Sequence, residues 1–135
     1  MARRLRIALV AHDARKDALI AWARRWEGWL ADHELCGTGT TSGEIERACP
    51  RLRVEALLSG PKGGDMQIGG RIAEGRLDAM VFLPDPGATH PHEADFQALI
   101  RMALLADIPL ALNAAGAEHL ARGLSQEGAG EAPGA

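Results

Sequence analysis

Five short polar stretches of the chain could carry chemistry: AHD, GTGTTSG, SGPKGGD, PDPGATHPHEAD and LNAAG. Their aspartates and histidines are Asp13, Asp65, Asp85, Asp95, His12, His90 and His92. Carboxylates that meet around one substrate can transfer protons, and a neutral histidine beside them can polarise a carbonyl group. Each aspartate also has a simpler interpretation as a turn residue or a helix cap. The residue types therefore favour proton transfer only if the fold brings these stretches together.

The stretch GTGTTSGEI has the features of an anion-binding loop. Its hydroxyls precede a helix expected to begin near Gly43, where free N–H groups favour a negative charge. The hydroxyl-bearing candidates are Thr38, Thr40, Thr41 and Ser42. Lys16, shortly after AHD, could add a positive charge. The loop is not a Walker P-loop, which ends in Gly-Lys-Ser/Thr. A Ser/Thr-rich helix cap and a surface lysine are the alternative interpretation.

Residues 57–70, LLSGPKGGDMQIGG, contain five glycines and one acid, Asp65. Glycine is costly to order, so this density indicates a backbone that bends sharply or approaches another group closely. The alternative is an ordinary turn between two packed elements.

Composition narrows the classes of partner. The chain has 135 residues, is 47% hydrophobic and 24% charged, and carries a formal net charge of −3. These values are typical of a soluble globular protein and give no reason to expect nucleic acid. No apolar run approaches the roughly 20 residues that span a bilayer. The segment RLRIALVA lacks the length and cleavage site of a secretory signal, so we expect a cytoplasmic protein with no membrane partner.

Metal and thiol chemistry are not expected. The alternating histidines at 90 and 92 lack a defined third ligand. Cys36 and Cys49 have neither a metal-type spacing nor the number that a disulfide scaffold needs.

Strands alternate with helices along most of the chain. The expected strands are residues 5–11, a brief run from 34, and residues 53–60, 77–83 and 108–113. The expected helices are residues 15–33, a run from about 43, and residues 66–76, 96–107 and 116–124. This alternation predicts a parallel sheet covered on both faces, with ligands bound at the carboxyl ends of the strands. All five polar stretches follow a strand, so we expect them to share one rim.

The predicted fold class is therefore α/β. We expect a single compact domain at residues 1–124, with a mainly parallel sheet of about five strands, helices on both faces and Rossmann- or flavodoxin-like layering. Residues 125–135, SQEGAGEAPGA, are small, polar and rich in glycine and proline, which predicts a disordered tail. Trp22, Trp26 and Trp29 share one helical face, which indicates a core or subunit contact.

The motifs VAHDARK, GTGTTSGEI, LLSGPKGGDMQIGGRIAEG, DPGATHPHEAD and RMALLADIPLALN resemble, in order and spacing, those of the methylglyoxal synthase family. The resemblance runs from about Arg6 to Asn113. It implies a compact parallel α/β domain that converts dihydroxyacetone phosphate to methylglyoxal and inorganic phosphate. It also implies no metal or organic cofactor, and assembly as a homohexamer.

The resemblance also implies a role for each site residue. Asp65 matches the catalytic base, His92 the residue that hydrogen-bonds the ketone oxygen, and His12 a residue that helps to hold the substrate. Asp13 and Asp95 match acids that tune the site and assist proton movement. The residues matching the phosphate-binding set are Lys16, Thr38, Gly39, Thr40, Thr41, Ser59 and Gly60.

A second function class is a non-catalytic sensor of phosphate or nucleotides. The same fold serves as a regulatory domain in carbamoyl phosphate synthetase. That interpretation does not require the acids, whereas this chain has Asp65, His92 and Asp95 at matching positions. The enzyme is therefore the favoured prediction.

Overall fold

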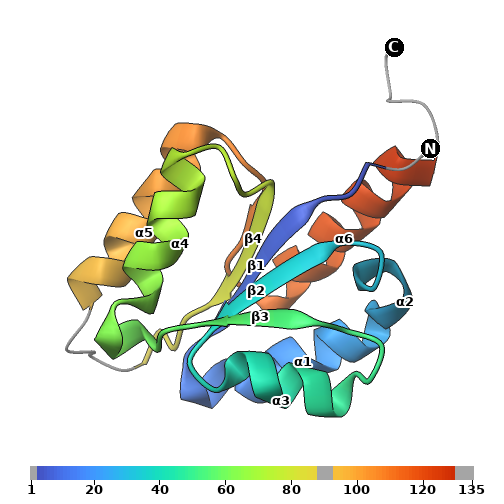
Figure 1. Cartoon of the computed structure of the whole chain (residues 1–135), viewed down its shortest axis with the longest axis horizontal. Helices are drawn as coiled ribbons and strands as arrows, with labels where there is room; N and C mark the ends of the chain where they lie inside the picture. The colour runs from blue at the N-terminus through green and yellow to red at the C-terminus, as the bar shows by residue number, and fades with distance from the viewer. Residues whose placement is uncertain (1–2, 88–92, 130–135) are drawn as a thin grey trace.

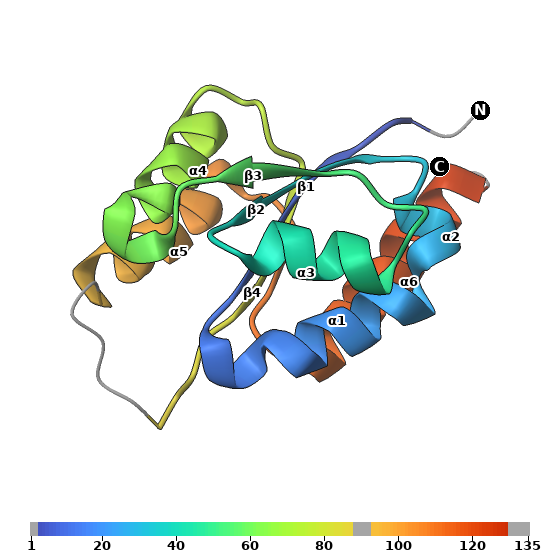
Figure 2. The ribbon, with the colours of Figure 1, turned by 60° about the horizontal axis from the view of Figure 1, so that its bottom comes forward.

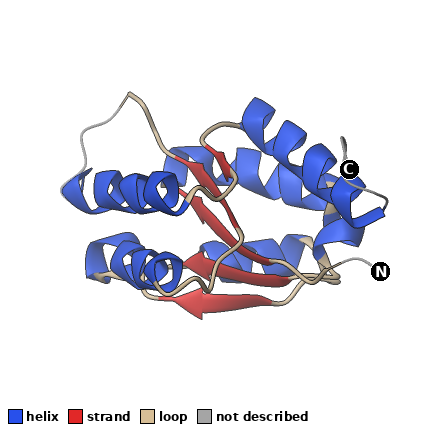
Figure 3. Cartoon of the chain, turned by 90° about the horizontal axis from the view of Figure 1, so that it is seen from above, coloured by secondary structure: helices blue, strands red, loops and turns tan. Residues whose placement is uncertain are grey.

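The sheet of this protein has five parallel strands in the order β3-β2-β1-β4-β5 (Figure 1). The structure, a computed structural model, describes residues 3–87 and 93–129. The strands are β1 (Arg6–Ala11), β2 (Glu34–Thr38), β3 (Val54–Leu57), β4 (Ala79–Leu83) and β5 (Leu110–Ala111). Figure 3 shows the strands, in red, side by side as one sheet with helices next to it. The predicted α/β class and parallel sheet are confirmed.

Both faces of the sheet are buried, as the continuous apolar strands predict. Alternate residues of β1 lie on opposite faces of the sheet: Ile7 and Leu9 belong to one apolar cluster, and Ala8 and Val10 belong to the other. Ile7 is paired with Leu35 of β2 and with Ala79 of β4, so β1 lies at the centre. This central position puts the residues after β1 in the middle of the carboxyl-end rim.

Four helices cover one face: α1 (Lys16–Arg25), α2 (Glu27–Leu30), α3 (Thr41–Ala48) and α6 (Ala114–Ala129) (Figure 2). Two tryptophans of the stripe contact α6. The Trp22 indole N–H donates to the Ala117 carbonyl at 2.9 Å, and the Trp26 N–H donates to Glu118 at 3.0 Å. Trp26 also leaves helical geometry, with φ −106° and ψ 17°, so the single helix expected over 15–33 is divided there. These two tryptophans therefore make contacts within the domain.

Two helices cover the other face: α4 (Gly64–Ala73) and α5 (Glu93–Ala106). Ile68 and Ile72 of α4 are buried with Leu99 of α5 against Val10 and Phe82 of the sheet. Arg71 makes two hydrogen bonds to the Glu55 carboxylate of β3, at 3.0 and 2.6 Å. Packing and this ion pair together hold α4 against the sheet.

The last helix is longer than the sequence predicts. A helix ending at Leu124 with a disordered tail from Ser125 is expected, but α6 continues to Ala129. Gln126 and Glu127 are good helix formers, and the three glycines and the proline that indicate disorder all come after them. The prediction is therefore wrong for 125–129, and 130–135 lie outside the described residues. No helix in the described part has both the length and the apolar character of a membrane span.

The glycine-rich stretch crosses close to its own backbone. Gly63 has φ +102°, a left-handed conformation that suits glycine. A Cβ on the next residue, Gly64, would fall on the Leu58 carbonyl oxygen and within 2.9 Å of Thr38 Cγ2. The stretch is therefore a close backbone approach, the first of the two interpretations, and α4 begins there.

We expect Gly64→Ala to lower the free energy of unfolding by about 1–3 kcal/mol, the usual cost of overpacking a well-packed site. Gly70→Ala is the matched control, since a Cβ there meets nothing within 4 Å and the residue lies in the same helix. That substitution should instead stabilise the protein by about 0.4–1 kcal/mol. Urea unfolding of both variants measures the difference, and equal effects would contradict the proposed close approach.

His33, at the other end of the sheet, is a buried histidine with a structural role. The Leu5 backbone N–H donates to its Nδ1 at 2.9 Å, and the residue is 8% exposed. Burial lowers the pKa of His33 below its usual 6.5, because it disfavours the charged ring. Protonation of Nδ1 would also remove this hydrogen bond.

Since the folded pKa of His33 lies below the unfolded one, its stabilising contribution is complete above about pH 6.5 and is lost as the pH falls through the folded value. We expect His33→Asn, which retains an acceptor without a proton to gain, to reduce the loss of Tm between about pH 7.5 and 5.5. Thermal unfolding of wild type and variant at both pH values measures this. An identical pH dependence would exclude His33 as a contributor.

Candidate active site

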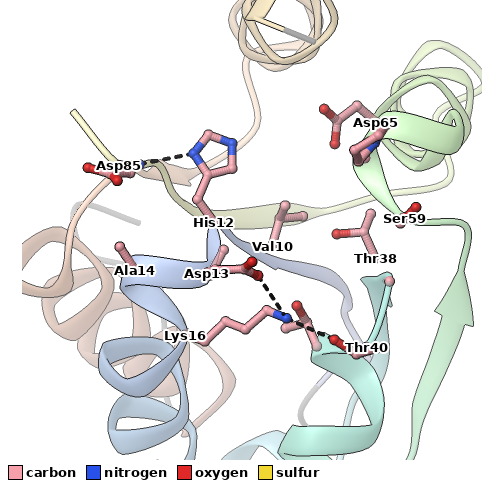
Figure 4. Close-up of a pocket in the computed structure, with 15 residues that line it drawn as sticks. Val10, His12, Asp13, Ala14, Lys16, Thr38, Thr40, Ser59, Asp65 and Asp85 are labelled. Atoms are coloured by element: carbon pink, nitrogen blue, oxygen red, sulfur yellow. Dashed lines mark hydrogen bonds and ion pairs between the residues drawn. The ribbon is translucent and has the colours of Figure 1, made fainter. Parts of the chain in front are cut away.

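A pocket of about 560 Å³ lies at the carboxyl ends of the strands (Figure 4). Its walls come from the segments that follow β1, β2, β3 and β4. Eleven residues that the sequence singles out line it: His12, Asp13, Lys16, Thr38, Gly39, Thr40, Thr41, Ser59, Gly60, Asp65 and Asp85. Four of the five polar stretches therefore share a rim, as strand alternation predicts, and the rim carries most of the candidate residues. The prediction is wrong for LNAAG, which follows β5 at the edge of the sheet and contributes no lining residue.

One side of the pocket is suited to an anion. The Lys16 ammonium donates to Thr40 Oγ1 at 2.8 Å and pairs with the Asp13 carboxylate at 3.1 Å. Helix α3 begins at Thr41, two residues before the expected start, so Thr41 and Ser42 lie in its first turn. The N–H groups of that turn favour a negative charge. A cation, hydroxyls and a helix start thus lie together.

The loop after β2 is tied to the loop after β3. The Gly39 N–H donates to the Leu58 carbonyl at 3.3 Å, and within the loop after β3 the Gly64 N–H donates to the Ser59 carbonyl at 2.9 Å. Gly39 has φ +56°, and a Cβ there would lie 3.3 Å from Ser59 Cβ. The two loops therefore form one wall, on which the Thr38 hydroxyl points towards the pocket (Figure 4).

Asp65 lies on that wall, as the second residue of α4, and is 3% exposed. Its carboxylate faces across the pocket towards His12 (Figure 4). The positive end of the α4 dipole stabilises a negative charge at this position. The arrangement provides a carboxylate that is largely shielded from solvent yet lines the cavity.

His12 faces Asp65 from the end of β1. The Asp85 backbone N–H donates to His12 Nδ1 at 3.0 Å, so the neutral ring carries its hydrogen on Nε2. The rings of Phe82 and Phe96 make edge contacts with the imidazole at 5.5 and 5.1 Å between centroids. Nε2 is on the edge that faces the Asp65 side of the pocket (Figure 4). His12 is therefore oriented as a hydrogen-bond donor.

Asp85 is a site residue whose role the sequence does not reveal. An aspartate suggests a role for its carboxylate in proton transfer, but Asp85 contacts His12 through its backbone N–H. The Asp85 carboxylate accepts the Gly87 N–H at 3.0 Å, which shapes the turn that aims the Asp85 N–H. The sequence feature that pointed to Asp85 was its position in a polar stretch that follows a strand.

The side chains of three candidate residues lie outside the described part of the structure. His90 and His92 lie outside the described residues, and Asp95 belongs to the first turn of α5 with its side chain outside the described part. Asp13 is placed, but its side chain is 96% exposed and pairs with Lys16. The described acid that faces the cavity from a buried position is Asp65.

Thiols and metals have no evident part in the described site. Burial raises the pKa of Cys36 to about 11 and also raises the pKa of Cys49, so both thiols are protonated at neutral pH. Within residues 3–87 and 93–129, no three His, Cys, Asp or Glu side chains are grouped as metal ligands. Proton transfer on a small anionic molecule is the chemistry that the described geometry accommodates.

Comparisons with known proteins find relatives along most of the chain. Residues 18–112 match the sequence model of the MGS-like domain family. The chain is 49% identical over 124 residues to a methylglyoxal synthase of Brucella ovis, covering 92% of this chain and 99% of the relative. It is 51% identical over 119 residues to a methylglyoxal synthase of Rhizobium rhizogenes, covering 88% and 94%.

A solved structure is similar as well. The crystal structure of a methylglyoxal synthase from Elizabethkingia anophelis NUHP1 superposes with a TM-score of 0.81 at 40% sequence identity. The match covers 87% of this chain and 77% of that one. The likeness therefore extends over most of the chain.

We expect Lys16→Met to weaken the binding of inorganic phosphate by about tenfold or more, because a charge-assisted hydrogen bond is lost. Lys62→Met is the matched control, since Lys62 is exposed in the glycine-rich stretch and does not line the pocket. Titration calorimetry with phosphate measures both variants. Equal affinities in the two variants would remove Lys16 from the anion site.

Proposed function

We propose that this chain, which belongs to the methylglyoxal synthase family, converts dihydroxyacetone phosphate to methylglyoxal and inorganic phosphate. In that reaction it would act as a carbon–oxygen lyase. The observation that carries the proposal is the pocket in which Asp65 and His12 face each other beside the Lys16–Thr40 pair. The relatives that share about half of this sequence along nearly its full length support it.

The phosphate group would bind at the anion side of the pocket. Lys16 would supply the charge, and the backbone and hydroxyls of the two joined loops would supply further donors. The residues proposed for this task are Lys16, Thr38, Gly39, Thr40, Thr41, Ser59 and Gly60. Binding there would place the triose carbons between Asp65 and His12.

Asp65 would then act as the catalytic base. It would remove a proton from the hydroxymethyl carbon next to the ketone, and the electron pair of that C–H bond would form the C=C bond of an enediolate. The His12 Nε2–H would donate to a substrate oxygen, since a neutral histidine can stabilise this charge. By family resemblance, His92 would hydrogen-bond the ketone oxygen. Asp13 and Asp95 would assist proton movement between the oxygens.

Loss of phosphate would complete the chemistry. The C–O bond to phosphate breaks when it stands perpendicular to the enediolate plane, because its σ* orbital then overlaps with the π system. The phosphate leaves with the bonding electron pair, and the remaining enol tautomerises to methylglyoxal. Holding the phosphate out of the plane is the proposed task of Lys16 and the joined loops. Since side chains perform each step, the proposed reaction requires no metal or cofactor.

The family resemblance also supports a homohexamer in the cytoplasm, with no nucleic-acid or membrane partner. Large exposed apolar side chains are available for subunit contacts: Leu104 is 67% and Leu105 is 69% exposed on α5. These surfaces support an oligomer.

The test is an assay of methylglyoxal and phosphate production from dihydroxyacetone phosphate in the presence of a metal chelator. We expect wild type to form both products, and Asp65→Asn to lower turnover by about 10²–10⁴, the usual contribution of a positioned general base. Asp32→Asn, an exposed aspartate before β2, is the control and should retain activity.

Three outcomes would contradict the proposal. Glyceraldehyde 3-phosphate without methylglyoxal would show that the phosphate is held in the enediolate plane. Near-normal activity of Asp65→Asn would remove this carboxylate from the mechanism. Phosphate binding without turnover would favour the regulatory sensor instead.

A further inference from the structure

Glu44 lies in the first turn of α3, beside the residues proposed to bind phosphate. Its Oε1 is 3.6 Å from the Lys16 ammonium and accepts a hydrogen bond from the Thr40 hydroxyl at 3.3 Å. Lys16 in turn donates to Thr40 Oγ1 at 2.8 Å. An acid is therefore in contact with both the cation and a hydroxyl of the anion site.

The Thr40 hydroxyl cannot serve Glu44 and a phosphate at once. A hydroxyl has one hydrogen to donate, and here that hydrogen is directed to Glu44 while the oxygen accepts from Lys16. To donate to a phosphate oxygen, Thr40 must release Glu44. Lys16 must at the same time share its charge between the carboxylate and the incoming anion.

Two acids contact Lys16, and they differ in how strongly each competes with a bound phosphate for the Lys16 ammonium. The Asp13 side chain is 96% exposed, so water screens its charge and it can turn away. The Glu44 side chain is 30% exposed, and that of Lys16 is 18% exposed. Glu44 is also held at the start of a helix, where a negative charge is favoured. Glu44 is therefore the acid that stays near a bound phosphate.

We propose that Glu44 sets the affinity of the phosphate site by competing with the ligand's phosphate for Lys16 and Thr40. Its charge also repels a phosphate dianion bound beside it. This effect weakens the binding of substrate and of released phosphate together, so it acts on occupancy and product release. The identity of the substrate rests on the proposed function, whereas the competition for phosphate does not.

A structural role makes the opposite prediction. If Glu44 served only to stabilise the start of α3 or to join it to α1, its loss would loosen the site. Phosphate affinity would then fall together with Tm. Competition instead predicts that neutralising Glu44 tightens phosphate binding.

The experiment is a calorimetric titration of wild type and Glu44→Gln with inorganic phosphate at low and high ionic strength. We expect the Kd to fall by about threefold to tenfold in the variant at low salt, and by less at high salt, where the charge is screened. Asp17→Asn is the matched control. Asp17 is an exposed acid in the first turn of α1, so it changes the net charge equally, and we expect no change in Kd.

An unchanged or higher Kd in Glu44→Gln, or an equal fall in Asp17→Asn, would overturn the proposal. Failure of wild type and variant alike to bind phosphate would overturn it too. A thermal scan confirms that the variant is folded. The KM for dihydroxyacetone phosphate should fall with the Kd. Because the titration needs no turnover, tighter phosphate binding without any product would contradict the proposed function and leave this inference standing.

Discussion

The site depends on one close approach of backbone to backbone, where Gly64 lies against the carbonyl of Leu58 and the side chain of Thr38. No side chain fits there, so the glycine is required by space rather than by flexibility. The approach starts α4 directly beside the ends of β2 and β3. It therefore places Asp65 in a buried position that still lines the pocket. A loop rich in glycine becomes a rigid wall because packing on both sides leaves it one arrangement.

The sheet provides the frame for this wall. Because helices cover both faces, apolar side chains fill both sides of every central strand, and polar residues remain at the strand ends. With β1 in the middle, the segments after β1, β2, β3 and β4 meet around one cavity. A carboxylate, an imidazole and a cation from separate segments are thus brought together without any of them having to be close in sequence.

Electrostatics then divides the cavity into two sides. His12 is oriented by the Asp85 N–H and two phenylalanine rings, opposite the carboxylate of Asp65. Across the pocket, Lys16 is shared between Thr40 and acidic neighbours. A site that holds phosphate less tightly at rest can release it more readily, and catalysis requires tight binding only in the transition state. The same residues can therefore serve both binding and release.

The sequence alone was sufficient for the alternating elements, the parallel sheet and the rim of polar loops, because periodicity and turn residues are local properties. The ordered motifs also singled out Asp65, His12 and Lys16. The sequence did not reveal the contact of His12 with the backbone of Asp85, 73 residues away. That contact exists because β1 pairs with β4, which brings the carboxyl ends of these two strands together. Nor did the sequence reveal the effect of Glu44 on Lys16, since those residues come from helices that only tertiary packing brings together.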